Sequence, residues 1–462
     1  MKKQNRVAFF NILSTLLLKG ISIFTAPLFS RLLGSSGYGV TSIYSIMTGA
    51  VAIAFPLQTQ GTLVNARVEY SEDVQNKYQS SVMGLSILSF ALFSAVLLLF
   101  RKPLGPVLGM DNFLIWLMLL QAFGTFCVSF LNTKFVYEMK AGWNMIISLG
   151  VTFTTLILSV VLILQMPQEV NYYGRVLAIS LTYGVIGIPA CIYIIAKGKS
   201  LFNREYWKFC LALAIPTVCY NLSDLILGQS DRLMLNGMLT TAAVGQYSLA
   251  LNFAGIMFTI FGALNKSWMP FFFDDLKKGD RQRVRSAADN FLELYTVLSV
   301  GFLLLTREVY HIFAAEEFWV GTDLVTVFVA SYFLNFLCTF PVNYEYYHKK
   351  TKIVAVITIS SSVLNIGLNY ILIRKLGMSG AAIATMVSHS VQLLMHYVYV
   401  RYILGKGDYP FGIRMWGKYL VVFAAAAGVF FLLKDLALLR WAVGAAVGAW
   451  ELWRIKKRKV LL

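Results

Sequence analysis

Apolar runs of about 20 residues, separated by short polar segments, repeat from one end of this chain to the other. A run of that length is what an α-helix needs to cross a hydrocarbon core roughly 30 Å thick. A membrane β-barrel would show short segments of alternating polarity instead, and the sequence lacks that pattern. The pattern therefore predicts an all-α integral membrane protein.

The runs predict about fourteen transmembrane helices. They cover residues 8–30, 39–57, 80–100, 112–131, 144–165, 175–196, 208–228, 244–265, 289–306, 323–342, 353–373, 379–400, 415–433 and 436–453. Because this number is even, both termini are expected on the same side of the membrane. No small-residue cleavage site follows the basic N-terminus, so we expect the first span to be retained rather than removed as a signal peptide.

The span at 208–228 carries polar and small residues on one face of an otherwise apolar helix. Thr217, Asn221, Asp224, Gly228 and Asp231 recur at spacings of 4, 3, 4 and 3, which places them along one stripe. An ionised carboxylate facing lipid is costly, so Asp224 should face protein or water inside a helical bundle. The stripe predicts a hydrated interior in the helical bundle, and that interior is the candidate functional site.

Other spans carry similar stripes. Lys19 lies about ten residues into the first span, hence about 15 Å deep at 1.5 Å per residue, where snorkelling to the surface is difficult. It is either a functional cation or one half of a structural ion pair, with Asp224 as the candidate partner. Asn365 belongs to a stripe on the span at 353–373. Stripes of polar residues also arise from hydrogen bonds between helices; that of the span at 112–131 consists of Gln121, Thr125, Ser129 and the following Asn132.

The two halves of the chain resemble each other. Arg31 and Arg232 each end a span just before a similar Gly- and Tyr-containing segment, and the segment 171–180 resembles 377–386 at nearly the same offset. Two parallel six-helix repeats follow from this, an arrangement known from alternating-access transporters. The predicted parts are an N-terminal lobe at 1–200, a C-terminal lobe at 201–405, and two further helices with a basic tail at 406–462.

The chemistry of the remaining candidates is open. Arg31 and Arg232 are either paired cations for a phosphate or anchors at the outer ends of their spans. His389 and His396 lie on one face of the span at 379–400, where either could carry a coupling proton or form hydrogen bonds within the bundle. Asp224 is the third candidate for ion coupling.

The net charge of +18 would suggest nucleic acid in a soluble protein. Here most lysines and arginines fall on the segments predicted to be cytoplasmic, as the positive-inside rule requires. The distribution of positive charge therefore reflects the orientation of the chain in the membrane, and both termini are predicted to be cytoplasmic. The sequence contains no P-loop, no H-E-x-x-H motif and no paired cysteine motif. No catalytic residue, metal or cofactor is predicted, and the five cysteines are expected to be buried thiols.

Several segments resemble the polysaccharide-repeat flippases (Wzx-type) of the MATE/MOP transporter superfamily. They are PLFSRLLGSSGYG (27–39), the Pro216-to-Asp224 spacing followed by SDR (230–232) and VGQYSLA (244–250), KSWMPFFFD (266–274) and LNYILIRKLGMSGAAIAT (368–385). The resemblance covers residues 1–405 or so, and it rests on the order and spacing of these segments rather than on one motif.

This resemblance implies two six-helix lobes in a V around a central cavity. It implies a substrate made of a polyprenyl pyrophosphate that carries an oligosaccharide repeat, moved from the cytoplasmic to the outer leaflet by alternating access. The expected location is a bacterial or archaeal cell membrane, with membrane lipid and a polysaccharide polymerase as further partners. The expected cavity residues are Lys19, Arg31, Asn221, Asp224, Arg232 and Asn365.

Two other classes of protein compete with this interpretation: other transporters of the same superfamily, and membrane-embedded enzymes of the same pathway. A lipid II flippase of the same superfamily also has fourteen spans but presents several cavity arginines, whereas a drug–cation antiporter carries an acid in its first lobe. Neither pattern fits a first lobe whose deep charge is Lys19. A membrane-embedded polymerase or glycosyltransferase needs a large outer loop or an acidic motif, and the sequence has neither.

Overall fold

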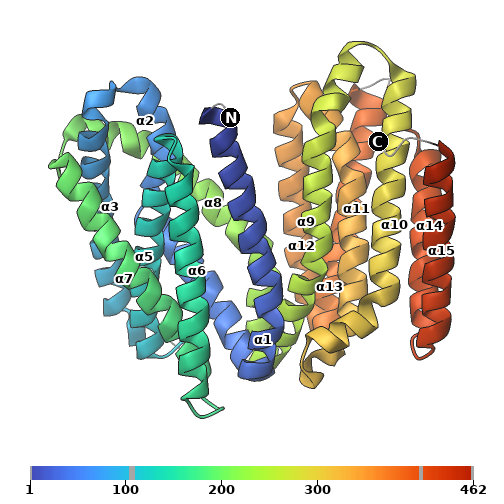
Figure 1. Cartoon of the computed structure of the whole chain (residues 1–462), viewed down its shortest axis with the longest axis horizontal. Helices are drawn as coiled ribbons and strands as arrows, with labels where there is room; N and C mark the ends of the chain where they lie inside the picture. The colour runs from blue at the N-terminus through green and yellow to red at the C-terminus, as the bar shows by residue number, and fades with distance from the viewer. Residues whose placement is uncertain (1–2, 103–109, 405–408, 459–462) are drawn as a thin grey trace. The chain divides into compact units, whose positions relative to one another are not determined.

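The computed structural model describes the backbone of residues 3–102, 110–404 and 409–458, and the chain is all-helical within these ranges (Figure 1). Contacts divide it into two compact units, Met1–Leu233 and Met234–Leu462. Each unit is described by itself below. The predicted parts 1–200, 201–405 and 406–462 stay predictions, and the side chains of the basic tail RIKKRK (454–459) lie outside the described residues.

Within its described residues, unit 1 contains six long helices and one short one. They are α1 (Lys3–Ala54), α2 (Leu63–Glu69), α3 (Gln75–Leu99), α5 (Asn112–Tyr137), α6 (Ala141–Leu164), α7 (Tyr172–Gly198) and most of α8 (Arg204–Met238). Short 3-10 helices, Thr59–Thr62 and Glu72–Val74, connect α1, α2 and α3.

Unit 2 contains α9 to α15. Their bounds are α9 (Thr241–Lys277), α10 (Arg281–Phe313), α11 (Thr322–Tyr347), α12 (Thr351–Leu376), α13 (Met378–Val398), α14 (Ile413–Leu432) and α15 (Ala437–Arg458). A 3-10 helix, Glu316–Gly321, precedes α11. A π-helical turn, Tyr399–Leu404, follows α13 directly.

The predicted spans coincide with these helices. Helix α1 carries the first two spans, and α3 and α5 to α15 carry one each. Among the described residues, eleven helices are long and apolar enough to cross a membrane, with α1 counted once. Helix α13, which carries several Ser, His and Gln side chains, is not one of them, and the apolar part of α15 is the shorter stretch Ala437–Ala449. The protein is a multi-pass integral membrane protein.

The first two spans are joined without a loop at Gly34. The backbone there has φ 67° and ψ 175°, a left-handed conformation that glycine adopts without steric cost. Residues on both sides remain helical, so the chain changes direction within one residue. The backbone geometry of this kink therefore explains why a glycine occupies position 34 in the 27–39 segment.

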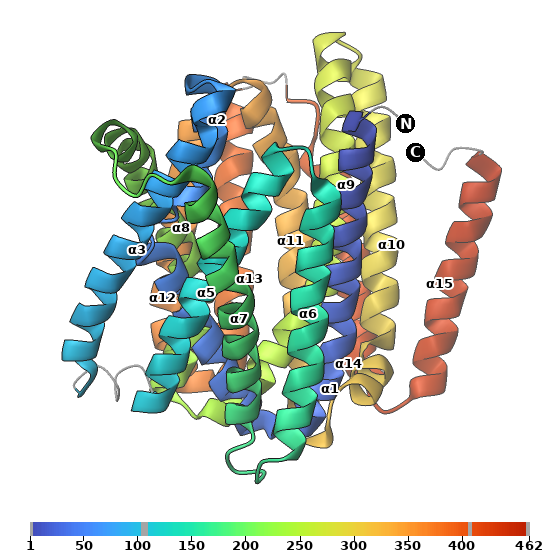
Figure 2. The same cartoon turned by 60° about the vertical axis from the view of Figure 1, so that its left-hand side comes forward.

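Three helix pairs pack in equivalent ways in both units, as the sequence repeat predicts. In unit 1, α5 packs on α7, α6 on α7 and α1 on α5, and Figure 2 shows α5, α6 and α7 side by side. In unit 2, α11 packs on α13, α12 on α13 and α9 on α11. These are the fourth, fifth, sixth and second spans of each repeat, in the same relation to one another.

Gly174 and Gly380 occupy equivalent places in the two repeats. A Cβ atom on Gly174 would lie 2.8 Å from the backbone nitrogen of Ile163 on α6, and one on Gly380 would lie 2.1 Å from the carbonyl oxygen of Leu372 on α12. Each glycine lets the start of one helix approach the end of the preceding helix. The similarity between 171–180 and 377–386 thus has a common physical cause.

A close crossing in unit 1 joins α5 and α7 through Gly124 and Gly187. A Cβ atom on Gly124 would lie 2.3 Å from the carbonyl oxygen of Tyr183, and one on Gly187 would lie 2.6 Å from the Cα of Gly124. Small residues allow helix backbones in membranes to approach closely and gain van der Waals contact. This crossing fixes α5 against α7.

The first half of α8 packs against α3 in unit 1. Tyr206 and Phe209 lie against the ring of Tyr78, with centroids 5.5 and 6.0 Å away, and Trp207 Nε1 donates to the carbonyl of Ser81 at 2.9 Å. Tyr78 is fully buried, and its hydroxyl lies 2.8 Å from Thr62 Oγ1. These contacts place the start of α8 in unit 1.

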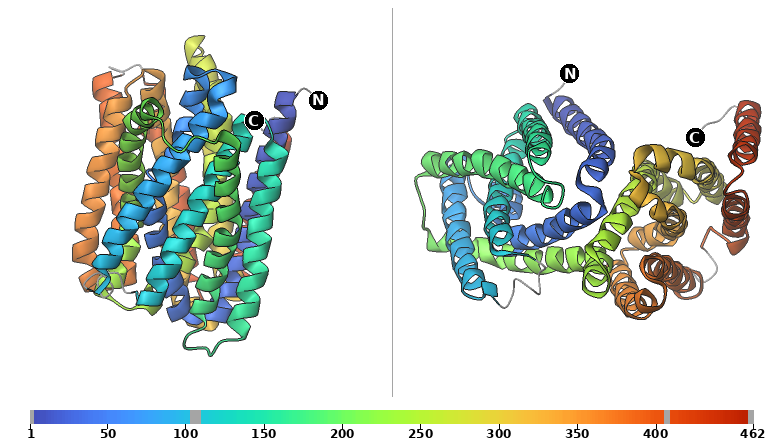
Figure 3. Two further views of the ribbon diagram at one scale, coloured as in Figure 1. Left: turned by 90° about the vertical axis from the view of Figure 1, so that its left-hand side faces the viewer. Right: turned by 90° about the horizontal axis from the view of Figure 1, so that it is seen from below.

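Helices α14 and α15 stand at one edge of unit 2 beside α10 (Figure 3). The buried Arg440 on α15 donates from Nε to the carbonyl of Leu304 at 2.9 Å and forms an ion pair with Glu308 on α10. A Cβ atom on Gly444 would lie 3.5 Å from Leu304 Cδ1. Helix α15 thus packs closely on α10 at Gly444.

The cysteines largely match the expectation of buried thiols. Cys127, Cys191, Cys210 and Cys338 are buried, and all five are free. Cys219 on α8 is exposed, so the prediction is wrong there. Among the described residues, no group of His, Cys, Asp and Glu is arranged to hold a metal ion.

We predict that Gly124→Ala disrupts unit 1. The added methyl group overlaps the backbone of α7, and overpacking of this kind costs about 1–3 kcal/mol or more. The measurement is the yield and the thermal unfolding temperature of the purified protein in detergent. Gly150→Ala on α6 is the matched control, because nothing lies within 4 Å of its Cβ position; equal behaviour of the two variants would contradict the prediction.

Candidate functional site

Two cations on α1 lie on the surface of unit 1. The side chains of Lys19 and Arg31 are both exposed, and a Cβ atom on the neighbouring Gly20 would meet nothing within 4 Å. Among the described residues, the structure records no ion pair for Lys19. The suggested pairing of Lys19 with Asp224 is therefore not seen. A lysine in a membrane helix needs water or a counter-charge, and Lys19 remains available for a ligand.

On helix α8, the side chain of Asp224 is exposed at the surface, whereas the side chain of Asn221 forms a hydrogen bond within unit 1. Asp224 is exposed, and no ion pair is recorded for it within the described ranges. Asn221 donates from Nδ2 to Oε1 of Gln58, which follows α1. Leu57 and Gln58 have φ values of 59° and 46°, a conformation uncommon for residues with a side chain. Asn221 thus holds a strained turn of unit 1.

The Asp231–Arg232 pair lies near the end of α8. Asp231 is buried and accepts a hydrogen bond from the backbone N–H of Arg232 at 2.8 Å. Arg232 is half-buried, and its Nε has no hydrogen-bond partner among the described residues. A buried guanidinium N–H without an acceptor is costly, so Arg232 has capacity to bind one more acceptor.

In unit 2, Asn365 belongs to a polar link between α12 and α13. Its Nδ2 donates to Oγ1 of Thr385 at 3.4 Å, and its Oδ1 accepts from Nδ2 of the fully buried Asn369 at 3.0 Å. Ser361 on α12 adds a hydrogen bond to the carbonyl of Ser388 on α13 at 2.9 Å. At these positions, the polar side chains of α12 therefore form hydrogen bonds between helices.

The two histidines of α13 have different environments, although both contact α11. His389 Nδ1 lies 2.7 Å from Ser331 Oγ and 3.2 Å from the Ser331 carbonyl, while Nε2 lies 3.5 Å from Asn335 Nδ2. A carbonyl accepts only, so Nδ1 carries the proton and both ring nitrogens are satisfied. His396 instead faces a carboxylate, with Nδ1 2.8 Å from Glu345 Oε1.

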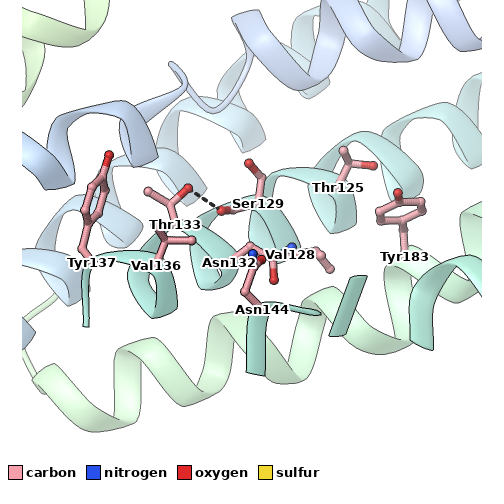
Figure 4. A pocket seen from close by; sticks show the side chains of 9 residues that line it. All are labelled: Thr125, Val128, Ser129, Asn132, Thr133, Val136, Tyr137, Asn144 and Tyr183. Atoms are coloured by element: carbon pink, nitrogen blue, oxygen red, sulfur yellow. Dashed lines mark hydrogen bonds between the residues drawn. The ribbon is translucent and has the colours of Figure 1, made fainter. Parts of the chain in front are cut away.

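A polar pocket of about 340 Å³ opens between α5, α6 and α7 of unit 1 (Figure 4). It is lined by Thr125, Val128, Ser129, Asn132, Thr133, Val136, Tyr137, Asn144 and Tyr183. Asn132 Nδ2 donates to Ser148 Oγ at 3.3 Å, while its buried Oδ1 has no partner among the described residues. Hydroxyl and amide groups around one space suit a ligand that carries hydroxyl groups.

Three of the nine lining residues belong to a polar stripe that the sequence shows on the span at 112–131. Thr125, Ser129 and Asn132 recur along one face of the span at 112–131, and the structure confirms that they share a face. Asn144 and Tyr183 were missed because they lie on other helices. Their place follows from how α6 and α7 pack on α5, which one helix pattern does not contain.

A buried lysine at the end of α5 was also missed. Lys134 is 1% exposed; its Nζ donates to Asn76 Oδ1 at 3.0 Å and to Gln79, and it lies 3.0 Å from Glu138 Oε1. Burial opposes ionisation of Glu138, but hydrogen bonds from Lys140 and Lys134 outweigh it and lower the pKa of this carboxyl. Lys134 thereby joins α5 to α3.

Comparison with known proteins gives the family. The family model described as "Polysaccharide biosynthesis protein" matches residues 6–276, more than half of the chain. A relative from Haloferax volcanii, named as a probable low-salt glycan biosynthesis flippase, Agl15, is 24% identical over 394 residues, which are 82% of this chain and 80% of that protein.

Solved structures with the same fold include transporters of the MATE/MOP type. The lipid II flippase MurJ in an inward closed conformation superposes with a TM-score of 0.65 at 16% identity, over 95% of this chain and 97% of that one. An inward-facing multidrug resistance MATE family transporter of the MOP superfamily gives 0.57 at 14% identity, over 86% and 95%. Similarity at this level of identity shows the fold alone.

We predict that Lys134→Met destabilises unit 1 by up to about 3 kcal/mol. Removing one partner of a buried ion pair costs about 3–5 kcal/mol, and the lower end applies because Glu138 is 26% exposed. Thermal unfolding of the purified protein in detergent measures the loss. Lys140→Met is the control: Lys140 pairs with the same Glu138 but is 47% exposed, so its loss should cost less than about 1 kcal/mol. Equal costs would contradict this account.

Proposed function

Since the chain belongs to the polysaccharide biosynthesis protein family, a family of glycan flippases and not of enzymes, we propose that it translocates a lipid-linked glycan. The substrate is a polyprenyl-pyrophosphate-linked oligosaccharide repeat, moved from the cytoplasmic to the outer leaflet by alternating access for surface polysaccharide biosynthesis. The observation that carries the proposal is the exposed Lys19 within the first predicted membrane span.

Lys19 supplies the charge that a pyrophosphate needs within the membrane. Phosphate groups lose hydration when they leave the headgroup region, and a fixed cation offsets part of that cost because Coulomb attraction is stronger where the dielectric constant is low. The exposed Arg31 and the unsatisfied Nε of Arg232 are further candidates for the same anionic group. Asn221 and Asn365, which are already hydrogen-bonded, would bind substrate only by exchanging those bonds.

The polar pocket of unit 1 offers groups that match sugar hydroxyls. Its amides and hydroxyls come from α5 and α6, and the ring of Tyr183 from α7. Sugar hydroxyls both donate and accept hydrogen bonds, as do amides and hydroxyl side chains. We assign the glycan to this pocket and the pyrophosphate to the cations.

The topology completes the proposal. The protein lies in a bacterial or archaeal cell membrane, with both termini in the cytoplasm. Residues 1–200 and 201–405 form its two lobes, and residues 406–462 form a C-terminal helix pair with a basic tail. Membrane lipid surrounds it, and a polysaccharide polymerase acts on its product. Asp224, His389 and His396 are the candidates for ion coupling.

We predict that Lys19→Ala reduces export of the polymer at least about tenfold, the cost of losing one charge-assisted hydrogen bond. The measurement is radiolabelled sugar in the polyprenyl-linked pool of the inner and the outer leaflet. Complete, unpolymerised lipid-linked repeats should accumulate on the cytoplasmic side.

Lys19→Arg is the matched variant and should retain most export, because the positive charge stays. Normal export by Lys19→Ala, with normal protein level, would exclude Lys19 from the site. Trapping of peptidoglycan precursor instead of the glycan repeat in a deletion strain would assign the protein to lipid II transport.

For the pocket, we predict that Asn144→Leu slows glycan translocation several-fold, because a hydrogen-bonding amide is replaced by an apolar side chain of similar size. Asn144 makes no side-chain hydrogen bond among the described residues that would be lost from the fold. The leaflet assay measures the rate, and Asn112→Leu at the start of α5, away from the pocket, is the control. An unchanged rate for Asn144→Leu would exclude this residue from glycan binding.

A further inference from the structure

Glu345 on α11 and His396 on α13 form a pair that no solvent reaches. Both side chains are 0% exposed, and His396 Nδ1 lies 2.8 Å from Oε1 and 3.0 Å from Oε2 of Glu345. Among the described residues, the structure records no other ion-pair partner for Glu345. The pair lies at the end of unit 2 that the sequence predicts to be cytoplasmic.

Aromatic side chains close the pair off from water. The segment after residue 408 places Tyr409 against Tyr344 with ring centroids 5.2 Å apart, and Tyr397 against Trp416 at 5.1 Å. Burial raises the pKa of Tyr409 well above its usual value, so the phenol stays neutral. The Tyr409 hydroxyl and His396 Nε2 are both buried without a hydrogen-bond partner in the described part of the chain.

Among the described residues, no recorded ion pair joins another charged side chain to Glu345 or His396. On the described elements at this end of unit 2, the charged groups include Asp275 on α9, Arg283 and Arg285 on α10, His348, Lys349 and Lys350 after α11, Lys352 on α12, Arg401 in the π-helical turn, and Arg414 and Lys418 on α14. Asp275 pairs with Arg283 at 3.4 Å, and Arg285 donates to the carbonyl of Pro410 at 2.7 Å. The groups after α11 and those on α12 and α14 are exposed.

The charge of the pair therefore depends on its protons alone. A neutral imidazole donates its one N–H from Nδ1 to the carboxylate, which leaves a net charge of −1 in a dry site. One more proton, taken from water, makes the pair neutral overall; on release that proton returns to water. An uncompensated buried charge costs several kcal/mol, so the closed packing requires the proton.

The backbone next to His396 departs from α-helical geometry. The π-helical turn Tyr399–Leu404 begins three residues after His396, and π-helical turns occur frequently at functional sites. It links α13 to the segment that carries Tyr409. A local change in this turn is the shortest route by which the aromatic cover can open.

We propose that Glu345 and His396 form a binding site for one proton, and that the bound proton keeps this end of unit 2 closed. Release of the proton opens the aromatic cover and lets water solvate the carboxylate. The link from this proton to substrate movement rests on the proposed function, in which it is the coupling ion. His389, whose ring nitrogens are both satisfied, does not take this role.

Hydrogen–deuterium exchange on the purified full chain tests the site without any transport. Exchange would be followed by mass spectrometry from about pH 4 to about pH 9, a range that includes the ordinary pKa values of both Glu and His, after correction for the intrinsic rate. Residues 339–347 and 409–416 should lose protection by tenfold or more as the pH rises. A flat wild-type profile would overturn the proposal whether or not any variant folds.

Glu345→Gln removes the titration but keeps a hydrogen bond from His396 Nδ1–H, so both segments should stay protected at every pH. His348→Asn is the matched control, an exposed histidine three residues from Glu345, and it should retain the wild-type transition. A transition that survives in Glu345→Gln, or disappears in His348→Asn, assigns the pH response to another group and overturns the site.

A transport measurement separates this inference from the proposed function. The probe is the lipid-linked glycan extracted from the parent strain, reconstituted with the protein in liposomes, with the pH on the predicted cytoplasmic face varied. Wild-type translocation should change several-fold with that pH, and the Glu345→Gln rate should not. If the wild type moves no glycan, the proposed function fails while the exchange result still decides the proton site. Glycan movement that ignores pH in the wild type contradicts the coupling.

Discussion

Neither a bilayer core nor the packed interior of a helix bundle offers water to hydrogen-bond a polar group, and this constraint accounts for polar contacts that join helices inside both units. Each buried polar group needs a hydrogen-bond partner within the protein, because an unpaired group retains the free-energy cost of losing its hydration. Lys134 meets Asn76, Gln79 and Glu138, and Arg440 meets Glu308 and three backbone carbonyls. These contacts join helices that lie far apart in sequence.

Close backbone approach is the second constraint, and the two repeats meet it in the same way. Without a hydrophobic driving force between helices in lipid, packing depends on how near the backbones come. Gly174 and Gly380 solve this problem at equivalent places, while Gly124 and Gly187 solve it at the α5–α7 crossing. The repeat therefore conserves contacts within each unit, even though its residue-level similarity is confined to a few segments.

Against this background, charges that remain exposed differ in kind from charges that are buried. Lys19 and Asp224 have no recorded ion pair among the described residues, whereas Lys134 and Arg440 are fully engaged. The first group is available for a substrate or an ion, and the second stabilises the fold. Glu345 and His396 fall between the two, because the pair is enclosed but its net charge changes with one proton.

The sequence by itself determined the membrane class, the helices and the polar faces, because hydropathy and the 3.6-residue period are local properties of the chain. It also predicted that Thr125, Ser129 and Asn132 share a face. Only the tertiary structure decided which polar groups meet: Asn221 with Gln58, Glu345 with His396, Asn144 beside the α5 stripe. Partners on separate helices are set by helix rotation and crossing, which depend on packing between distant segments and leave no periodic signal in either helix alone.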